Sequence, residues 1–489
     1  MLNLFKRAES FGNRIAIEHE GNCFSYNELV NRSNLIASFL LEKNKRDLNE
    51  ERIAFLLDPD INYITTLWGI WKAGGVAVPL SLSAKKEELI HYLSDTDAKL
   101  LITSEKYNSR LDSIDLDNLK IHLIENVDLV ETKRLPEIDF HRDAMVLYTS
   151  GTTSKPKGVV STHKNIDSQI SALVEAWEWN KNDHIPLFLP LHHIHGIINA
   201  LSSPLYVGGK VTMLGSFEIN ELCRQVASKK FSVFTAVPTV YFSLIDELEE
   251  SKNKEAIEGF KSMRLMMSGS AALAPEIHKK WEELTGQKLL ERYGMTEIGM
   301  ALSNSYKGER RPGSVGTTLP KVQIKLQDDS GNEINEEEKP GQILIKGPQV
   351  FRKYLNLEDK TKESFKEGWF LTGDVAILEN GYYKILGRES VDIIKTGGYK
   401  VSALEIEDIV LRHKEVKECA VVGIQDIKWG EIIAVAIVSK DKEMNLEEIK
   451  DWCSEFLSDY KLPRKLIYID ELPKNSMGKV TKPLVKELF

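Results

Sequence analysis

The strongest constraint on the fold of this chain is the alternation of helical patterns with short apolar segments over its first two-thirds. Apolar residues recur at helical spacing over 25–42 and 61–72, and strand-length apolar runs follow at 52–57 and 75–80. A helical pattern at 85–94 precedes further runs at 100–103, 145–148, 211–214, 233–236 and 265–268. Alternating strands and helices form parallel sheets covered by helices, so we predict an α/β fold.

The pattern changes after Tyr306. Segments 322–327 and 341–346 alternate apolar with polar residues, as half-buried antiparallel strands do. The turn-forming residues 328–332 lie between them. A small β-rich module at about 307–387 is therefore expected.

A third region starts near Arg388. Ser402 and Glu405 have the spacing of a capping box, which would open a helix over 403–411. Strands are predicted at 416–422, 432–438 and 466–469, and a helix at 446–457. This order of helices and strands predicts a separate, compact α+β unit.

Charge and composition exclude several classes of protein. The chain has 64 Lys and Arg against 73 Asp and Glu, a net charge of −9, so no nucleic-acid partner is expected. Its four cysteines form no CxxC pair, so no zinc site is expected. The longest apolar run, 63–82, is interrupted by Lys72 and two glycines, so no membrane segment is expected. The N-terminus lacks a secretory signal, and we expect a cytoplasmic protein.

The segment 148–158 is the first that suggests chemistry. It concentrates hydroxyl residues, glycines and lysines after a predicted strand, a composition that suits polyphosphate. It is not the common GxxxxGK[ST] loop, because the spacing fails and Pro156 lies inside it. The alternative is a flexible polar turn. The candidate residues are Thr149, Ser150, Gly151, Thr152, Thr153, Ser154, Lys155 and Lys157.

Two further segments carry candidate ligands. In 291–297, Tyr293 offers a stacking face, Thr296 a phosphate donor and Glu297 a hard oxygen ligand for Mg²⁺. The alternative for this segment is a helix end with an exposed charge pair. In 368–374, Asp374 follows a tight glycine turn and can accept both hydroxyls of a ribose. Near the C-terminus, Lys479 follows a glycine; alone, such a lysine is ordinarily solvated.

In this order and spacing, the four segments resemble the adenylate-forming superfamily of acyl-CoA synthetases, adenylation domains and luciferases. The resemblance runs from about Ala8 to the C-terminus. It implies a large N-terminal domain, 1–387, of two helix-covered sheets plus a small β-barrel-like module. A hinge at 388–392 would join it to a smaller mobile α+β domain, 393–489.

A narrower resemblance is to malonyl-CoA synthetases of the malonyl/methylmalonyl type, carried by segments 190–196, 292–299 and 395–407. A dicarboxylate needs a fixed cation for its non-reacting carboxylate, and Arg292 can grip it bidentately. His195 and His193 would contact the same carboxylate, with His195 shortening and polarising the pocket. The alternative for His195 is a structural histidine.

The resemblance also implies two half-reactions, with ATP and coenzyme A as co-substrates. Lys479, Thr152 and Glu297 would be catalytic, and Thr152 and Glu297 would hold Mg²⁺. Lys155 and Lys157 would escort pyrophosphate. The other ATP-binding residues would be Gly269, Ser270, Ala271, Glu291, Tyr293, Gly294, Met295, Thr296, Asp374 and Arg388. Gly397, Gly398 and Tyr399 would bind coenzyme A after the C-terminal domain has turned, when Lys479 has left the site.

Two positions depart from the superfamily pattern. Ser154 stands where the phosphate loop usually has glycine. The hinge usually reads Gly-Arg-x-Asp/Lys-Asp, but residues 387–392 read Gly-Arg-Glu-Ser-Val-Asp, so we expect the hinge residue within 390–392. Three functions stay open. The first is malonate activation with methylmalonate tolerated. The second is a CoA ligase for another small acid or an enzyme that loads a carrier protein, and the third is a nucleotide-binding sensor. A monomer or homodimer is expected, in the mitochondrial matrix if the source is eukaryotic.

Overall fold

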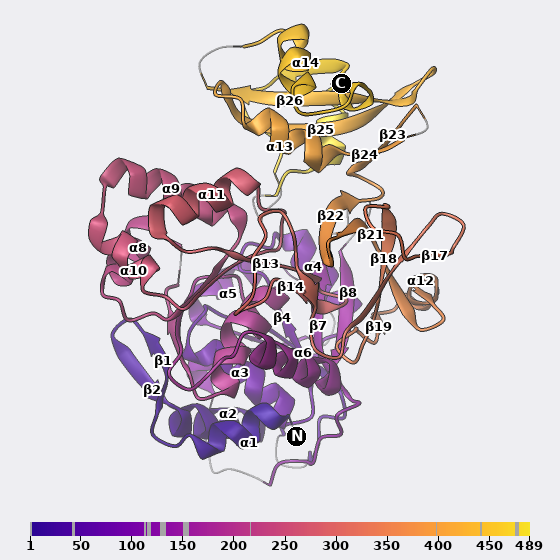
Figure 1. The fold of residues 1–489 in the computed structure, drawn as a ribbon. Helices are drawn as coiled ribbons and strands as arrows, with labels where there is room; N and C mark the ends of the chain where they lie inside the picture. Colours follow the sequence, from indigo (N-terminus) through magenta and orange to yellow (C-terminus); the bar gives the residue numbers. More distant parts are fainter. Residues whose placement is uncertain are drawn as a thin grey trace.

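The computed structural model describes residues 2–41, 45–111, 114, 119–127, 134–149, 156–215, 217–397, 399–440, 443–474 and 479–489. Figure 1 shows a large part built from the chain before Arg388 and a smaller part, built from the C-terminal residues, stacked against one end of it. The structure confirms the predicted α/β class.

The first sheet of the large part has the strand order β19-β8-β7-β4-β3-β5-β6, and the strands from β7 to β6 are parallel neighbours. Strands β8 and β19 extend it in antiparallel fashion. The strands are β3 (Arg52–Leu56), β4 (Val76–Pro79), β5 (Leu100–Thr103), β6 (Lys120–Leu123), β7 (Asp143–Thr149), β8 (Lys157–Thr162) and β19 (Lys353–Tyr354).

The second layer consists of two sheets, with the orders β11-β12-β13-β14-β15 and β2-β1-β10-β9. They adjoin where the N–H of Ser232 donates to the carbonyl of His184 at 2.9 Å. The strands are β1 (Ile15–His19), β2 (Asn22–Ser25), β9 (His184–Leu187), β10 (Lys210–Met213), β11 (Val233–Ala236), β12 (Leu265–Ser268), β13 (Leu290–Met295), β14 (Gly299–Ser303) and β15 (Thr317–Thr318).

Helices cover both layers, and the largest hydrophobic core lies between them. In β4, Val76 and Val78 pack with α4 (Lys86–Asp95) and α5 (Glu105–Leu111), whereas Ala77 faces the central core with α2 (Tyr26–Leu40) and α3 (Ile61–Lys72). In β11, Phe234 packs with the outer helices. The other helices of the large part are α1 (Asn3–Ser10), α6 (His163–Ala176), α7 (Ser203–Tyr206), α8 (Ile219–Ala227), α9 (Pro238–Ser251), α10 (Lys254–Lys261), α11 (Pro275–Thr285) and α12 (Glu358–Glu363).

The remaining two sheets follow in the chain. The β-rich module has the order β17-β16-β18-β21-β20, with β22 paired to β21, and the C-terminal sheet has β24-β23-β26-β25, with β27 paired to β26. Their elements are β16 (Gln323–Gln327), β17 (Glu333–Ile334), β18 (Gly341–Lys346), β20 (Phe365–Lys366), β21 (Trp369–Glu379), β22 (Tyr382–Arg388), β23 (Ile393–Thr396), β24 (Tyr399–Ser402), β25 (Val416–Asp426), β26 (Gly430–Ser439), β27 (Lys465–Tyr468), α13 (Ala403–Leu411), α14 (Leu446–Ser454) and α15 (Lys482–Lys486).

One predicted capping motif forms only in part. The Oγ of Ser402 accepts a hydrogen bond from the N–H of Glu405 at 3.3 Å. The Glu405 carboxylate, however, binds Nζ of Lys461 at 2.7 and 2.8 Å instead of returning to the helix start. A cation distant in sequence therefore takes the second half of the capping box, which local spacing could not reveal.

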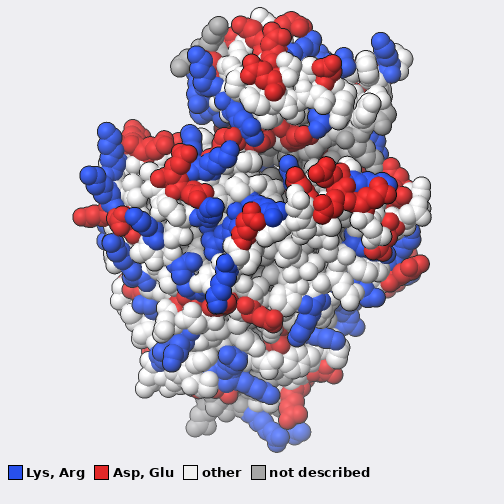
Figure 2. Space-filling view, viewed as in Figure 1, with Lys and Arg blue, Asp and Glu red and all other residues white. Residues whose placement is uncertain are grey.

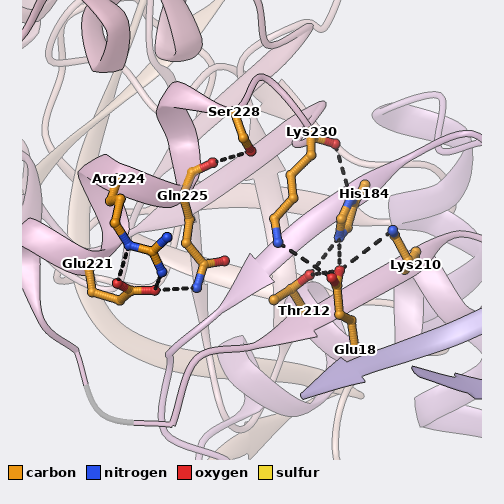
Figure 3. A network of polar contacts seen from close by, with 9 residues as sticks. All are labelled: Glu18, His184, Lys210, Thr212, Glu221, Arg224, Gln225, Ser228 and Lys230. Atoms are coloured by element: carbon orange, nitrogen blue, oxygen red, sulfur yellow. Dashed lines mark hydrogen bonds and ion pairs between the residues drawn. The ribbon is translucent and has the colours of Figure 1, made fainter. Parts of the chain in front are cut away.

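A polar network braces β9, the strand that leads toward the histidines of 190–196 (Figure 3). The Oγ1 of Thr212 lies 2.8 Å from Oε2 of Glu18 and 2.7 Å from Nε2 of His184. Nζ of Lys210 and Nζ of Lys230 each lie 3.6 Å from the Glu18 carboxylate. These contacts tie β1, β10 and β9 together at one end of their sheet.

Charged side chains of both signs are mixed over the face drawn in Figure 2, and they also gather where the C-terminal part meets the large part. At this junction, Nε of Arg412 lies 3.0 Å from Oε1 of Glu276 on α11. None of the helices within the described ranges is long and apolar enough to cross a membrane.

Helix α3 contacts the segment 190–196, since the hydroxyl of Tyr63 donates to the carbonyl of Leu191. A buried lysine fastens α3 to α2. Lys72 is 1% exposed, and its Nζ donates to Oγ of Ser33 and Oδ1 of Asn34, both at 2.8 Å. Burial lowers the pKa of Lys72 to about 8.

This shift predicts a pH-dependent stability. Between about pH 8 and the ordinary lysine value of 10.5, the unfolded chain holds a proton that the folded protein has lost. The free energy of unfolding should therefore rise with pH in this window by up to about 1.4 kcal/mol per pH unit, and Lys72→Met should remove this rise. Urea unfolding at several pH values measures it. Lys164→Met, at an exposed lysine, should keep the wild-type slope; equal slopes in the wild type and Lys72→Met would contradict the prediction.

Candidate active site

The candidate site lies where three neighbouring parallel strands end. Strands β11, β12 and β13 are parallel, so their carboxyl ends meet at one edge of the sheet. Thr235, Ser268 and Arg292 lie at or near these ends, and Gly269 and Ser270 follow β12 directly. The sequence prediction that groups 269–271 with 291–297 is thus compatible with the topology.

Arg292 is the central charge of this edge. It is 3% exposed, and its Nε and Nη2 have no hydrogen-bond partner in the part of the chain that the structure describes. Its guanidinium packs against Gly269, where a Cβ atom would lie 2.5 Å from Cζ of Arg292. Burial lowers the pKa of Arg292 to about 10, so the group remains cationic at neutral pH. A buried cation without a partner costs free energy, and an anion would offset that cost.

The two predicted histidines differ in their contacts. Both ring nitrogens of His195 are engaged, Nδ1 with Oγ of Ser270 at 3.1 Å and Nε2 with Oγ1 of Thr235 at 2.8 Å. Burial, with Arg292 nearby, holds the pKa of His195 well below its usual value. Nε2 of His193 is instead buried without a partner among the described residues, and burial lowers its pKa to about 3. His195 therefore braces Ser270 as a neutral ring, and His193 offers the open nitrogen.

His195 begins a π-helix, His195–Ser202, a geometry often found at functional sites. Gly196 permits a close approach, since a Cβ atom there would lie 2.4 Å from the carbonyl oxygen of Pro190. In the same helix, the side-chain amide of Asn199 is buried, and neither of its polar atoms has a partner in the described ranges. The sequence reasoning missed Asn199; the one available signal was a polar residue inside an apolar run.

Asp374, the candidate ribose ligand, is held in place by neighbouring side chains. The hydroxyl of Tyr293 donates to Oδ2 of Asp374 at 2.6 Å, and Nε of Arg388 donates to Oδ1 at 3.0 Å. The N–H of Asp374 donates to Oγ1 of Thr372 at 3.1 Å. Asp374 is thereby held in one orientation from three sides.

Glu297 is the candidate metal ligand that the structure describes. It is 6% exposed, and its Oε1 accepts a hydrogen bond from the hydroxyl of Tyr354 at 2.9 Å. Burial raises the pKa of Glu297, because the charged carboxylate loses contact with water. A cation bound there would offset the free-energy cost of burying this charge. The described residues contain no cluster of three or more metal-ligating side chains. One carboxylate nevertheless fits Mg²⁺, which is usually held by one or two carboxylates together with substrate phosphates. Nζ of Lys157 lies 5.5 Å from the centre of the Tyr354 ring.

Lys479 reaches this site from the far end of the chain. Burial lowers its pKa, and the nearby charges of Arg292 and Arg388 lower it further. The charge of Lys479 also acts on His193. The structure thus places Lys479 close to residues more than ninety positions earlier, as a site shared by both parts of the molecule requires.

Other predicted residues occupy different surroundings. The carboxylate of Glu291 is hydrogen-bonded to Nδ1 of His278 at 3.1 Å and accepts a hydrogen bond from the N–H of Gly313 at 2.9 Å. Its side chain is therefore engaged with other protein groups in the interior. Thr149 closes the strand pair β7–β8 through Lys157. Ala271 is exposed beside Ser270, whereas Gly294 and Met295 end β13 and Thr296 begins the turn that follows it.

Two candidate coenzyme A residues are described: Gly397 follows β23, and Tyr399 begins β24. Tyr399 is 55% exposed and stacks on Tyr460 with ring centres 4.3 Å apart, while the N–H of Gly397 donates to the carbonyl of Trp429. No contact between these residues and Arg292 is found in the described part of the chain. Ser150, Gly151, Thr152, Thr153, Ser154, Lys155 and Gly398 lie outside the described residues.

Comparison with known proteins gives consistent matches. The AMP-binding enzyme family matches residues 4–355, and the AMP-binding enzyme C-terminal domain matches residues 405–479. A Mus musculus protein named malonate–CoA ligase ACSF3, mitochondrial, is 40% identical over 528 residues, which cover 99% of this chain and 90% of that protein.

Two solved structures extend the comparison. ATP-bound MatB from Rhodopseudomonas palustris is similar with a TM-score of 0.90 and 30% identity, covering 100% of this chain and 99% of that one. A malonyl-CoA ligase in a ternary product complex with methylmalonyl-CoA and AMP has a TM-score of 0.70 and 32% identity, covering 97% and 100%.

The unpaired guanidinium predicts an unusual stability effect. Arg292→Met removes a buried charge but keeps most of the side-chain volume, so the ligand-free protein should gain about 1–3 kcal/mol in free energy of unfolding. Arg264→Met is the matched control. Arg264 binds the buried Asp183 at 2.7 and 2.6 Å, so its removal should destabilise the protein. Urea unfolding without ligands compares both variants. A lower free energy of unfolding in Arg292→Met than in the wild type would contradict the conclusion that the buried cation destabilises the protein.

Proposed function

The chain belongs to the AMP-binding enzyme family, and on this premise we propose that it is a malonate–CoA ligase. It would join malonate to coenzyme A through a malonyl-adenylate, releasing pyrophosphate and then AMP. The full-length similarity to malonate–CoA ligases supports the substrate class. The observation that carries the proposal is the buried guanidinium of Arg292 at the ends of β11–β13, whose Nε and Nη2 have no hydrogen-bond partner among the described residues.

The pocket chemistry favours a small dicarboxylate. A monocarboxylic acid with an apolar tail brings no second charge to offset the buried Arg292, whereas the second carboxylate of malonate can pair with its Nε and Nη2. The open Nε2 of His193 offers a further contact. Methylmalonate should also react, since one methyl group changes discrimination by only about 1–3 kcal/mol.

In the first half-reaction, the free carboxylate of malonate attacks the α-phosphorus of ATP. A carboxylate–phosphorus bond forms, the bond to the bridging oxygen breaks, and pyrophosphate leaves. Both reactants are anions, so the residues act mainly by neutralising and positioning charge. Lys479 would stabilise the charge that develops on the α-phosphate, and Asp374 with Arg388 would hold the ribose. Glu297 and Thr152 would hold Mg²⁺, which when bound screens the phosphate charges.

In the second half-reaction, the thiolate of coenzyme A attacks the acyl carbon and AMP leaves. We propose that residues 393–489 turn about 388–392 between the two steps, carrying Lys479 out and Gly397, Gly398 and Tyr399 in. The TM-score of 0.90 with an ATP-bound relative, against 0.70 with a product complex that holds a CoA thioester, supports the first arrangement for this structure. We place the enzyme in the cytoplasm or, in a eukaryote, in the mitochondrial matrix, as a monomer or homodimer.

The substrate is tested by CoA-dependent AMP formation with malonate, methylmalonate, succinate, acetate and octanoate. Malonate should react best. Arg292→Ala should reduce kcat/KM for malonate by roughly 100-fold or more, because losing a charged hydrogen-bond partner costs about 2–5 kcal/mol. Arg224→Ala, at an exposed arginine paired with Glu221 on the same helix, should have the wild-type kcat/KM for malonate. If acetate or octanoate has the highest kcat/KM and Arg292→Ala leaves kcat/KM for malonate unchanged, the assignment to malonate fails.

The role of Lys479 predicts that one half-reaction can be lost alone. Lys479→Ala should abolish malonate-dependent pyrophosphate release but still convert supplied malonyl-AMP to malonyl-CoA. The reason is that the developing phosphate charge needs the ammonium only in the first step. Assays of the two half-reactions measure this; an equal loss in both would refute a role confined to adenylate formation.

A further inference from the structure

A buried ion cluster joins the proposed hinge to the segment that carries Lys479. Lys482 is 9% exposed, and its Nζ lies 2.6 Å from Oδ1 of Asp392 and 2.8 Å from Oε1 of Glu407. Lys482 begins α15, only three residues after Lys479, whereas Asp392 lies at the end of the proposed hinge and Glu407 on α13. Three segments that are distant in the chain therefore meet at one ammonium group.

Asp392 also closes the hinge turn itself. Its Oδ2 accepts a hydrogen bond from the N–H of Arg388 at 2.9 Å, and its own N–H donates to the carbonyl of Arg388 at 2.7 Å. Gly387 allows this turn, since it has a φ of +126° and a Cβ atom there would lie 2.3 Å from Cβ of Asp392. One carboxylate thus holds the turn with one oxygen and Lys482 with the other.

Glu407 provides the rigid side of the cluster. Its side chain is 14% exposed on α13, and its Oε1 accepts from the N–H of Val421 on β25 at 2.7 Å. Burial by itself would lower the pKa of Lys482, but Glu407 and Asp392 raise it, so Lys482 remains cationic. The cluster is therefore a set of fixed charges inside the protein, where removing one partner is costly.

The segment before Lys482 has another anchor in the described part of the chain, because Nζ of Lys474 lies 2.6 Å from Oε2 of Glu418 on β25. Lys474 and Val480 form one β-bridge, and the N–H of Thr481 donates to the carbonyl of Pro473 at 2.8 Å. These two contacts hold the segment to itself, whereas the ion pair of Lys474 holds it to β25. Lys482 is the side chain that ties it to the hinge turn and to α13.

We propose that Lys482 is a positioning residue for adenylate formation, because it fixes Lys479 relative to the closed hinge turn through Asp392 and Glu407. The inference rests on the proposed function, since it assumes that Lys479 serves the first half-reaction alone. When the C-terminal part turns about 388–392, the bonds of Asp392 to the turn must change. The Lys482–Asp392 contact therefore belongs to the arrangement in which Lys479 faces Arg292 and Arg388.

Lys482→Met tests the proposal in the full-length enzyme with both half-reactions measured separately. Malonate-dependent pyrophosphate release should fall roughly 100-fold, the scale for a catalytic group displaced by about 1 Å. Conversion of supplied malonyl-AMP should stay within about threefold of the wild type, because that step does not use Lys479. Lys482→Arg, which keeps the cation, should recover most of the lost pyrophosphate release.

Lys461→Met is the matched control, because Lys461 also pairs with a glutamate of α13 but does not touch the hinge. It should leave pyrophosphate release unchanged. An equal loss of both half-reactions in Lys482→Met would mean a structural role only, and unchanged pyrophosphate release would mean no role; either result overturns the proposal. The proposed function is judged separately, because it fails if the wild type itself releases no pyrophosphate with malonate.

Discussion

The candidate site is arranged around one buried charge, the guanidinium of Arg292, whose Nε and Nη2 have no partner among the described residues. Three parallel strands converge behind it, and Gly269 lets the backbone approach its face. His195 stays neutral while it holds Ser270 and Thr235, so it adds no second charge beside the cation. The fold thus keeps a dehydrated positive charge in place, and a substrate with a spare carboxylate is its natural complement.

The mechanism that we propose also requires a cation from the far end of the chain to join this site for only part of the reaction. Lys479 lies beside Arg292 and Arg388, so three positive charges surround the place where anionic substrates would meet. Like charges repel one another, so an anionic substrate bound between these groups would stabilise this arrangement. The hinge turn closed by Asp392, together with the ion pair between Arg412 and Glu276, offsets that repulsion in the present arrangement.

The sequence predicts much of this organisation and misses the parts that depend on distant contacts. The helix at 61–72 and the strands at 100–103 and 265–268 were predicted with the bounds that the structure has, because apolar periodicity is a local property. The helix-end alternative for 291–297 was wrong, since this segment forms β13 and its turn. Pairing of β13 with β12 and β14, the π-helix at His195 and the two bonds of its ring all require partners that no local pattern reveals.

The central claim is that Arg292 selects the second negative charge of the substrate, and the most direct test changes the substrate rather than the protein. We would compare kcat/KM of the wild-type enzyme for malonate and for malonic acid monoamide, which has nearly the same shape but a neutral second group. The account predicts that malonate is preferred by roughly 100-fold or more, the scale of a lost pairing with a buried charge. Equal rates for the two acids would contradict it.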